Sequence, residues 1–376
     1  MNDAPNLKVA IVCDWLLGIG GAERVVLELH KMFPDAPIYT SQYNPKKINL
    51  FDNADVRTTW LQKLPSGLKK FLPVLRAWTF SHLDLSDYDF VISATGAEAK
   101  SVRTGSKTVH LCYCFAPTHY YWSRYDQYID SPGFGAFNWL ARLGLRTLVG
   151  PMRRWDKKAA QRPDHLIGIS TYIQNEIKKY YGRDAGLIHP PVNIERFQSS
   201  KAKPQNLRHG FVVTGRQVSY KRIDLAIAAC TRLSLPLTVI GDGPEHANLV
   251  KLAGPTVKFL TDTSDSDVVE YFHTSEAFIF PGLDDFGIVA VEGMAAGMPV
   301  IAYKGGGALD YIVPTKTGEF FDKQNVESLV SSLKKFKSDK FSESRIRGEA
   351  ELFDASHFHQ AMQGYIRKTL FAKKQQ

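Results

Sequence analysis

Short apolar runs alternate with amphipathic segments along this chain, and the alternation forms two series. In the first half, residues 7–13 have the continuous apolar character of a buried parallel strand, and residues 22–32 place Val25, Val26 and Leu29 on one helical face. Later apolar runs predict further strands at residues 37–40, 90–93, 108–113 and 165–169. Strands and helices in alternation are typical of an α/β domain with a parallel sheet.

The same pattern begins again in the second half. Its apolar runs predict strands at residues 211–214, 237–240, 277–280 and 299–302. A helix is predicted at 223–233, and a polar segment with several breaking residues, from about 189 to 207, separates the two series. We therefore predict two doubly wound, Rossmann-like domains, residues 1–200 and 201–355, that face each other across a cleft.

Length and composition agree with two hydrophobic cores. A chain of 376 residues with 44% hydrophobic side chains is too large for one ordinary core. The four cysteines lie within or beside apolar runs without the spacing of a zinc site, which indicates reduced, structural thiols. The first residues lack the features of a secretory signal, and the sequence has no run of about 18 uncharged apolar residues. We therefore expect a cytoplasmic protein.

Positive charge is concentrated in the first half of the chain. The formal net charge is +9, and residues 141–183 hold ten Lys or Arg against three acids. Residues 57–82 add five bases and no acid. Since such regions attract anions, we expect an anionic partner to approach this half.

Two carboxylates lie in the segment from Pro281 to Val300. The segment leaves an apolar strand, passes through a loop with Asp284 and enters a small-residue helix that holds Glu292. Both acids can face one molecule near a positively polarised helix end, which suits a hydroxyl-rich ligand that carries phosphate. The competing explanation is that Asp284 and Asp285 cap the helix.

Two cations follow the first strand of the second half. Arg216 lies on the loop after Gly215, and Lys221 lies at the start of the next helix, so both can hold a diphosphate beside a helix N-terminus. In the first half, glycines at 18, 20 and 21 follow the first strand. The third glycine of a dinucleotide fingerprint would fall at Glu23, which argues against a dehydrogenase and leaves a ligand loop or a tight turn.

These segments together resemble the retaining nucleotide-sugar glycosyltransferases of family 4, which have the GT-B architecture. The resemblance covers nearly the whole chain and extends to bacterial polysaccharide and O-antigen mannosyltransferases. It implies an N-terminal acceptor-side domain and a C-terminal nucleotide-sugar-binding domain. It also implies that a C-terminal helix at 356–376 crosses back to the first domain. The helical spacing of Phe358, Met362, Ile366 and Leu370 agrees with such a helix.

The resemblance implies roles for individual residues. Asp284 would contact hydroxyls of the donor sugar and Glu292 the nucleotide ribose, while Arg216 and Lys221 would stabilise charge on the leaving diphosphate. The other residues expected to bind the donor are Gly20, Gly21, Gly215, Phe286, Gly287 and Ile288. The family usually has Glu where this chain has Asp284. The shorter Asp keeps the negative charge, but the resemblance does not fix which contact it makes with the sugar.

The expected chemistry needs neither a covalent enzyme nucleophile nor a cofactor beyond the nucleotide-sugar donor. Asp87-Tyr-Asp89 and Asp265-Ser-Asp267 fit the Asp-x-Asp pattern of metal-using glycosyltransferases. The first precedes a predicted strand and the second opens a helical stretch, where Asp commonly forms turns and caps. We therefore predict no metal.

Residues 110–122 resemble a segment of the polysaccharide members of the family. Those usually have His, Arg and Asp where this chain has Phe115, His119 and Ser123. His119 and Tyr113 are assigned by resemblance to the acceptor or sugar side. Aromatic residues at this density more often pack a domain edge, and a surface His without a role is an equal alternative for His119. The three replacements indicate an altered sugar, an altered acceptor or lost activity.

Residues 60–80 mix aromatic, leucine and cationic side chains in the manner of an interfacial segment. With the basic region at 141–183, they predict docking on an anionic membrane that holds a lipid-linked acceptor. The alternative is a solvated basic face over ordinary helices.

The sequence therefore predicts a retaining glycosyltransferase that moves a hexose to a lipid-linked or oligosaccharide acceptor in cell-surface polysaccharide synthesis. Mannose from GDP-mannose is favoured by resemblance, and peripheral attachment at the inner face of the plasma membrane is expected. A UDP-sugar-dependent transferase, a nucleotide-sugar epimerase and a basic module that binds membrane or nucleic acid are the alternatives. Nucleic acid is not the expected partner.

Overall fold

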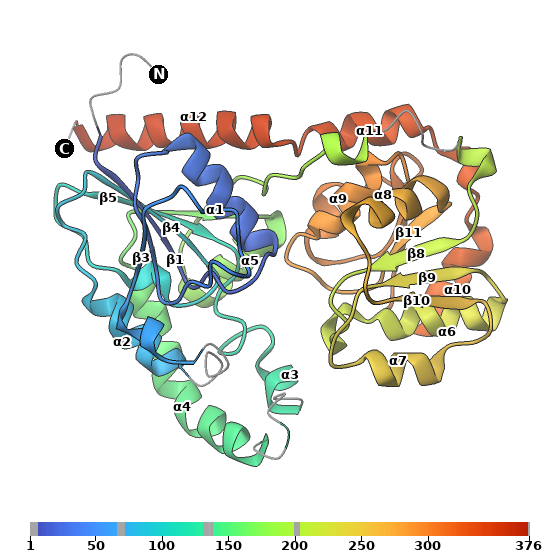
Figure 1. The fold of residues 1–376 in the computed structure, drawn as a ribbon, viewed down its shortest axis with the longest axis horizontal. Helices are drawn as coiled ribbons and strands as arrows, with labels where there is room; N and C mark the ends of the chain where they lie inside the picture. The colour runs from blue at the N-terminus through green and yellow to red at the C-terminus, as the bar shows by residue number, and fades with distance from the viewer. Residues whose placement is uncertain (1–6, 66–71, 131–134, 136–137, 199–203, 375–376) are drawn as a thin grey trace. The chain divides into compact units, whose positions relative to one another are not determined.

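The chain forms two compact units, each with its own fully parallel sheet (Figure 1). Unit 1 takes in the chain up to Pro191 and again from Phe358, and unit 2 runs from Val192 to His357. The computed structural model describes residues 7–65, 72–130, 135, 138–198 and 204–374. The two parallel sheets confirm the prediction of an α/β protein with two Rossmann-like domains.

Unit 1 is built on a seven-stranded sheet with the order β3-β2-β1-β4-β5-β6-β7. Its strands are β1 (Val9–Cys13), β2 (Ile38–Thr40), β3 (Val56–Thr58), β4 (Phe90–Thr95), β5 (Val109–Cys114), β6 (His165–Gly168) and β7 (Gly186–Leu187). Its helices are α1 (Gly21–Met32), α2 (Pro73–His82), α3 (Tyr125–Asp130), α4 (Asn138–Ala159) and α5 (Thr171–Tyr181). Every residue of β1, β4 and β5 is buried, which explains their largely apolar sequences.

Unit 2 is built on a six-stranded sheet with the order β10-β9-β8-β11-β12-β13. Its strands are β8 (Phe211–Thr214), β9 (Leu237–Ile240), β10 (Val257–Leu260), β11 (Ala277–Phe280), β12 (Val300–Tyr303) and β13 (Gly318–Phe321). Its helices are α6 (Ile223–Leu233), α7 (His246–Leu252), α8 (Asp265–Thr274), α9 (Ile288–Ala295), α10 (Val326–Lys335) and α11 (Glu343–Glu351). In Figure 1, α8 and α9 lie on one face of this sheet, and α6, α7 and α10 lie on the other.

The strand order of unit 2 places two loops side by side. β8 pairs directly with β11, although more than 60 residues separate them in sequence. β9 and β10 continue the sheet on the β8 side, and β12 and β13 continue it on the β11 side. The loops that leave β8 and β11 therefore meet at the point where the strand order reverses, which is the usual ligand position in such sheets.

Helix α12 (Ala355–Lys374) begins in unit 2 and continues into unit 1 from Phe358. Its Phe358, Met362 and Ile366 are buried, as the helical spacing predicts. The Phe358 ring packs edge-on against Tyr113 at 5.7 Å between centroids. Parts of three predicted segments lie outside the described residues, namely 66–71, 199–203 and 375–376.

Candidate functional site

The loop between β11 and α9 carries Asp284, and a glycine turn holds this loop in place. Gly307 N donates a hydrogen bond to the Asp284 carbonyl oxygen at 2.9 Å. A Cβ atom added to Gly306, which has φ +64°, would lie 2.3 Å from the same oxygen. Only residues without a side chain permit this approach, so the turn determines where the Asp284 backbone lies.

The Asp284 carboxylate forms an ion pair with Lys221. The Asp284 side chain is 8% exposed and that of Lys221 is 21% exposed. The second oxygen, Oδ1, is buried and has no hydrogen-bond partner among the described residues. A buried polar atom without a partner is costly, and a hydroxyl of a bound ligand would satisfy it.

Gly287 shapes the start of α9. Its φ of +95° is unfavourable for other residues, and an added Cβ would lie 2.5 Å from the Phe280 ring and 2.7 Å from the Tyr311 hydroxyl. Gly287 is also the N-cap residue of α9, so the alternative that Asp284 is this N-cap is wrong. The Tyr311 hydroxyl donates to the Phe286 carbonyl oxygen at 3.0 Å and thereby supports the turn.

The remaining predicted residues of this segment occupy different environments. Glu292 is buried within α9, in the second turn of the helix. Ile288 is half-buried at the first position of α9. The Phe286 ring is buried against Tyr311 and Phe353, so only its backbone remains for a ligand.

Arg216 lies on the loop that leaves β8, and its side chain is exposed. It forms no ion pair or side-chain hydrogen bond within the described part of the chain. The preceding Gly215 has φ +142°, and no atom lies within 4 Å of an added Cβ. Glycine is needed there for its backbone conformation rather than for space. The structure thus brings Lys221 and Asp284 into contact, and Arg216, which precedes Lys221 on the segment after β8, has no ion-pair partner among the described residues.

Gly20 and Gly21 lie in unit 1, where they form the exposed start of α1. Gly20 is the N-cap, and its φ of −148° is extended backbone that any residue adopts. The first turn of α1 also holds Glu23, which is buried.

Tyr113 is fully buried in β5, and its hydroxyl donates to the Ile188 carbonyl oxygen at 2.9 Å. Its ring also packs edge-on against Phe115. This placement favours the packing alternative for Tyr113 over a role in stacking on a sugar. His119 is half-buried, and its Nδ1 lies 2.9 Å from the Ser123 hydroxyl. Two of the three positions that depart from the family pattern therefore contact each other.

Sequence reasoning missed a buried charge network in unit 1. Lys100 and Asp156 form a fully buried ion pair at 2.7 Å. Asp156 also accepts hydrogen bonds from Trp122 Nε1 at 2.7 Å and from the Tyr181 hydroxyl at 2.8 Å. Burial opposes the charge of Lys100, but Asp156 more than offsets this, and the pKa of Lys100 is raised. The only sequence signal was a Lys that closely follows an apolar strand.

A second buried ion pair joins Arg76 of α2 to Glu98 at 2.9 Å. Burial raises the pKa of Glu98 against the opposing charge of Arg76. The Asp14 carboxylate, just after β1, accepts from Thr95 Oγ1 at 2.8 Å and from Ala99 N at 2.9 Å. These polar groups tie together the carboxyl-end loops of β1 and β4.

The two Asp-x-Asp segments have structural roles. Asp267 forms a capping box with Ser264 at the start of α8, and Asp89 accepts from Lys8 N at 2.9 Å. No three His, Cys, Asp or Glu side chains lie together as metal ligands within the described residues. Over the same residues, none of the helices is both long enough and apolar enough to span a bilayer.

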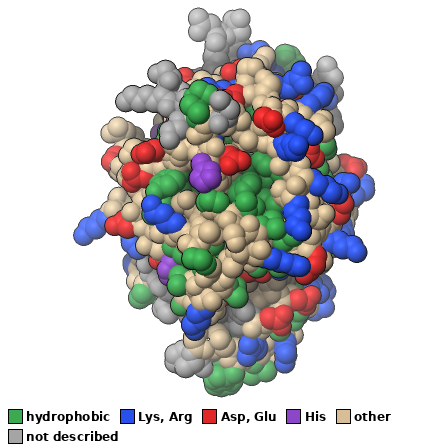
Figure 2. Space-filling view, turned by 90° about the vertical axis from the view of Figure 1, so that its right-hand side faces the viewer, with side chains coloured by type: hydrophobic (Ala, Val, Ile, Leu, Met, Phe, Trp, Pro, Cys, Tyr) green, Lys and Arg blue, Asp and Glu red, His purple; other side chains and the backbone are tan. Residues whose placement is uncertain are grey.

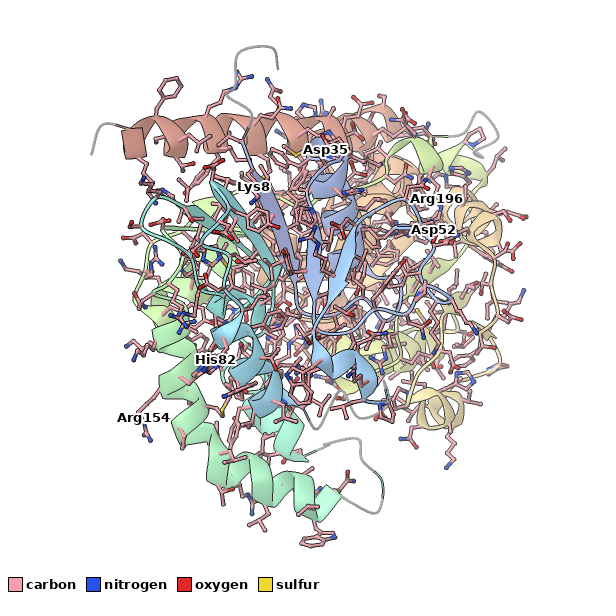
Figure 3. The ribbon with its side chains drawn as sticks, turned by 60° about the vertical axis from the view of Figure 1, so that its left-hand side comes forward. Lys8, Asp35, Asp52, His82, Arg154 and Arg196 are labelled. Atoms are coloured by element: carbon pink, nitrogen blue, oxygen red, sulfur yellow. The ribbon has the colours of Figure 1, made fainter. Side chains whose placement is uncertain are left out.

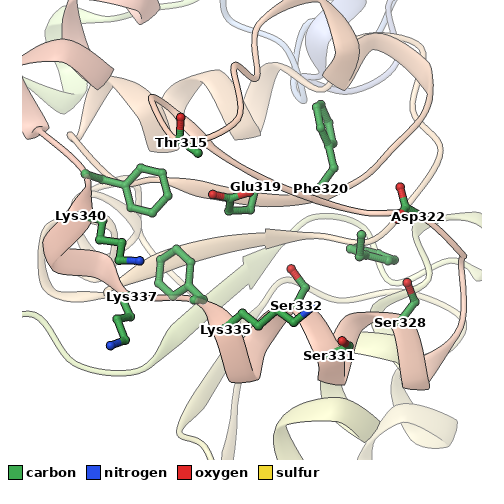
Figure 4. A pocket seen from close by; sticks show the side chains of 13 residues that line it. Thr315, Glu319, Phe320, Asp322, Ser328, Ser331, Ser332, Lys335, Lys337 and Lys340 are labelled. Carbon is green, nitrogen blue, oxygen red and sulfur yellow. The ribbon is translucent and has the colours of Figure 1, made fainter.

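A pocket of about 410 Å³ lies between β13 and α10 in unit 2 (Figure 4). Phe336 and Phe341 form part of its wall, together with Lys335, Lys337 and Lys340. None of the residues predicted to bind a sugar nucleotide lines this pocket.

Residues 193–352, which make up nearly all of unit 2, match the family described as "Glycosyl transferases group 1". This range holds Arg216, Lys221, Asp284 and Glu292. Unit 2 is therefore similar to group 1 glycosyltransferase domains.

Curated relatives agree with this match. An uncharacterized glycosyltransferase of Methanocaldococcus jannaschii is 28% identical over 182 residues, which cover 47% of this chain and 50% of the relative. A GDP-mannose-dependent alpha-mannosyltransferase of Mycolicibacterium smegmatis is 30% identical over 184 residues, which cover 46% of this chain and 48% of the relative. The chain thus spans about half the length of these relatives.

Similar solved structures extend over both units. Anabaena HepE in complex with UDP has a TM-score of 0.67 and 17% identity, and the match covers 96% of this chain and 100% of that chain. WaaG, a glycosyltransferase involved in lipopolysaccharide biosynthesis, has a TM-score of 0.65 and 16% identity, and the match covers 94% of this chain and 98% of WaaG. At these identities the similarity shows the fold alone, and it confirms the predicted GT-B type of architecture.

Proposed function

We propose that this chain, which is similar to group 1 glycosyltransferases at residues 193–352, is a retaining glycosyltransferase that uses a nucleotide-sugar donor. The observation that carries the proposal is the Lys221–Asp284 pair at the β8–β11 switch point, with the buried Asp284 Oδ1 still lacking a hydrogen bond among the described residues. The Lys221 ammonium can bind a phosphate, and the Asp284 carboxylate in contact with it can accept a hydrogen bond from a hydroxyl. A sugar phosphate has both a phosphate and hydroxyl groups.

In this proposal the residues act mainly by electrostatics and positioning. Arg216 and Lys221 stabilise the negative charge that grows on the leaving diphosphate as the glycosidic bond breaks. Asp284 accepts a hydrogen bond from a sugar hydroxyl, and Glu292 accepts one from the ribose. The acceptor hydroxyl then attacks the anomeric carbon on the face that the diphosphate leaves and gives its proton to an oxygen of the leaving diphosphate, so the configuration is retained without a covalent enzyme intermediate.

Backbone groups complete the proposed donor site. The amides of Gly287 and Ile288 lie at the start of α9, where N–H groups without intrahelical partners favour phosphate. Gly20 and Gly21 offer the same chemistry at the start of α1 in unit 1. Gly215 contributes its loop conformation, since its own N–H donates to the Ile240 carbonyl oxygen at 3.0 Å.

Mannose from GDP-mannose is the donor that the relatives favour. Several curated relatives are GDP-mannose-dependent mannosyltransferases, including one that acts on phosphatidylinositol monomannoside by its name. We therefore include a lipid-linked glycan as the acceptor, with the protein attached to an anionic membrane surface from the cytoplasmic side. A UDP-sugar donor is the second candidate, since HepE is described with UDP-glucose.

Thermal unfolding with nucleotide sugars tests the proposal. A donor at one hundred times its dissociation constant adds about 2.7 kcal/mol of stability, which raises the melting temperature of a domain of this size by several degrees. We expect GDP-mannose to raise it more than UDP-glucose does.

Two variants and one matched control make the test specific. Arg216→Ala and Lys221→Ala should lower mannose transfer by about two or more orders of magnitude. Arg232→Ala, on α6 in the same unit, changes an exposed arginine outside the site and should leave transfer unchanged. Normal transfer by both site variants, or stabilisation by none of the nucleotide sugars, would contradict the proposal.

A further inference from the structure

The outward face of α4 carries large apolar side chains at one end and cations along the rest. Trp139, Leu140 and Leu143 are 63%, 48% and 53% exposed. The exposed cations that follow are Arg146, Arg154, Lys157 and Lys158. At 100° per residue these seven positions fall within roughly 120° of the helix circumference. They therefore form one continuous stripe, which we call the α4 stripe.

The opposite face of α4 is attached to unit 1 along the C-terminal half of the helix. Met152, Asp156 and Ala159 are buried, and Asp156 is bound in the ion pair with Lys100. Arg142, near the apolar end, donates to the Ile129 and Asp130 carbonyl oxygens, both at 2.9 Å. The helix is therefore held from its inward side, and folding does not account for the apolar residues of the stripe.

The cations of the α4 stripe are available for a partner. The one acidic residue in the sequence of α4 is Asp156, which points inward. None of the four cations forms an ion pair with another described residue. Figure 3 shows Arg154 projecting away from the body of unit 1. By contrast, Lys and Arg are interspersed with Asp and Glu on the face seen in Figure 2.

We infer that α4 is the segment that enters an anionic membrane, with Trp139, Leu140 and Leu143 in the lipid and the cations on the headgroup phosphates. The inference rests on the proposed function, which places the protein at an anionic membrane surface, and it identifies α4 as the helix that binds this surface. A membrane fits the α4 stripe because the insertion of apolar side chains into lipid and the attraction of cations to anionic headgroups are each weak alone. Together they can hold a protein stably on a membrane. Trp is the side chain that favours the boundary between headgroups and acyl chains.

Helix α2 supplies a neighbouring contact. Its Val74, Leu75 and Trp78 are exposed, while its Ala77 packs in one cluster with Met152 of α4. The two helices therefore lie side by side. The exposed residues of α2 belong to the segment 60–80 that the sequence singled out, so two independent apolar groups lie on neighbouring helices of unit 1.

Vesicle co-sedimentation of the full chain tests this inference. We expect binding at low salt to vesicles that contain phosphatidylglycerol and much weaker binding to pure phosphatidylcholine. Leu143→Ser should weaken binding at least tenfold, or about 1.4 kcal/mol, since it removes the contribution of a leucine side chain buried in lipid. The control Leu252→Ser, at an equally exposed leucine of α7 in unit 2, should bind as the unchanged protein does.

The charge component has its own pair of variants. Arg154→Gln should weaken binding to the anionic vesicles about fivefold, because a cation near such a surface contributes about 1 kcal/mol. Lys251→Gln, at an exposed lysine of α7, should not. With brominated lipids, the quenching of tryptophan fluorescence should decrease in Trp139→Phe.

Equal binding by Leu143→Ser and Leu252→Ser, or equal binding to neutral and anionic vesicles, would overturn the inference. Self-association of the chain that Leu143→Ser abolishes would assign the stripe to a second copy instead. Arg216→Ala should bind vesicles normally. If no nucleotide sugar stabilises the chain while the α4 variants still lose vesicle binding, the transferase proposal fails and the membrane inference stands.

Discussion

Lys221→Met removes the cation that Asp284 contacts in unit 2. The substitution keeps the length and apolar stem of the side chain and deletes only the charge. Asp284 then has a second buried carboxylate oxygen without its ionic partner, in addition to Oδ1. The change therefore tests whether the contact matters to the fold, to the chemistry or to both.

The expected loss of stability follows from how deeply the pair is buried. Removing one partner of a fully buried ion pair costs about 3–5 kcal/mol because the other charge remains uncompensated. Here the Lys221 side chain keeps about one fifth of its surface exposed, so water can reach the vacated space. We expect a loss of about 1–3 kcal/mol in the free energy of unfolding, the range for one unsatisfied buried group.

Urea unfolding of a double-mutant cycle measures this loss. Lys221→Met and Asp284→Asn are compared with the double variant, in which no charge remains unpaired. The double variant should recover most of the stability, which gives a coupling of about 1–3 kcal/mol. The exposed pair Lys304–Asp322, at 3.7 Å in the same unit, is the control and should give a coupling below about 1 kcal/mol.

Donor turnover separates the structural role from the chemical one. All three variants at Lys221 and Asp284 should lose about two orders of magnitude in transfer, because each removes a group that contacts the donor. Zero coupling in the cycle would contradict the buried ion pair. A double variant that recovers both stability and turnover would show that the pair serves the fold alone and would refute the catalytic assignment.

Three further predictions concern the fold. Lys100→Met leaves buried Asp156 uncompensated and should lower the free energy of unfolding by about 3–5 kcal/mol in urea titrations, against no loss for exposed Lys334→Met. Burial lowers the pKa of His110 to about 3. The contribution of the neutral His110 side chain to the free energy of unfolding is therefore complete above the unfolded pKa of 6.5. That contribution is lost as pH falls from there toward 3, by up to about 1.4 kcal/mol per pH unit, and His110→Gln should reduce this slope. Gly287→Ala should lower the melting temperature and weaken donor binding, because the new Cβ would clash with Phe280 and Tyr311. Gly364→Ala places its new Cβ where no atom lies within 4 Å, so it should add up to about 1 kcal/mol of stability. A stabilising Gly287→Ala and a destabilising Gly364→Ala would contradict the geometry.

The regular elements could be predicted because their signals are local. The runs at 211–214, 237–240 and 277–280 coincide with β8, β9 and β11, and the helix at 223–233 coincides with α6. Strands buried on both faces need uninterrupted apolar residues, and an amphipathic helix needs apolar residues on one side. Neither requirement depends on which segments are neighbours in space.

The candidate site could be predicted in part. The loop positions of Arg216, Lys221 and Asp284 follow from the strands that precede them. The resemblance assigns Tyr113 to the acceptor or sugar side, but the residues that surround it, Ile188 and Phe358, come from distant parts of the chain. Whether an aromatic side chain at a strand end is open or enclosed depends on those distant segments, which local patterns do not reveal.

The sequence by itself determined the two α/β series, the parallel strands and the types of charged residue at their carboxyl ends, because periodicity and composition are properties of neighbouring residues. Only the tertiary structure decided that Lys221 contacts Asp284, that Lys100 and Asp156 neutralise each other inside unit 1, and that α4 turns its apolar and basic stripe outward. Each of these depends on strand order and helix rotation. Both are set by how the whole unit packs, since a charge is stable in the interior only where a distant segment brings its partner.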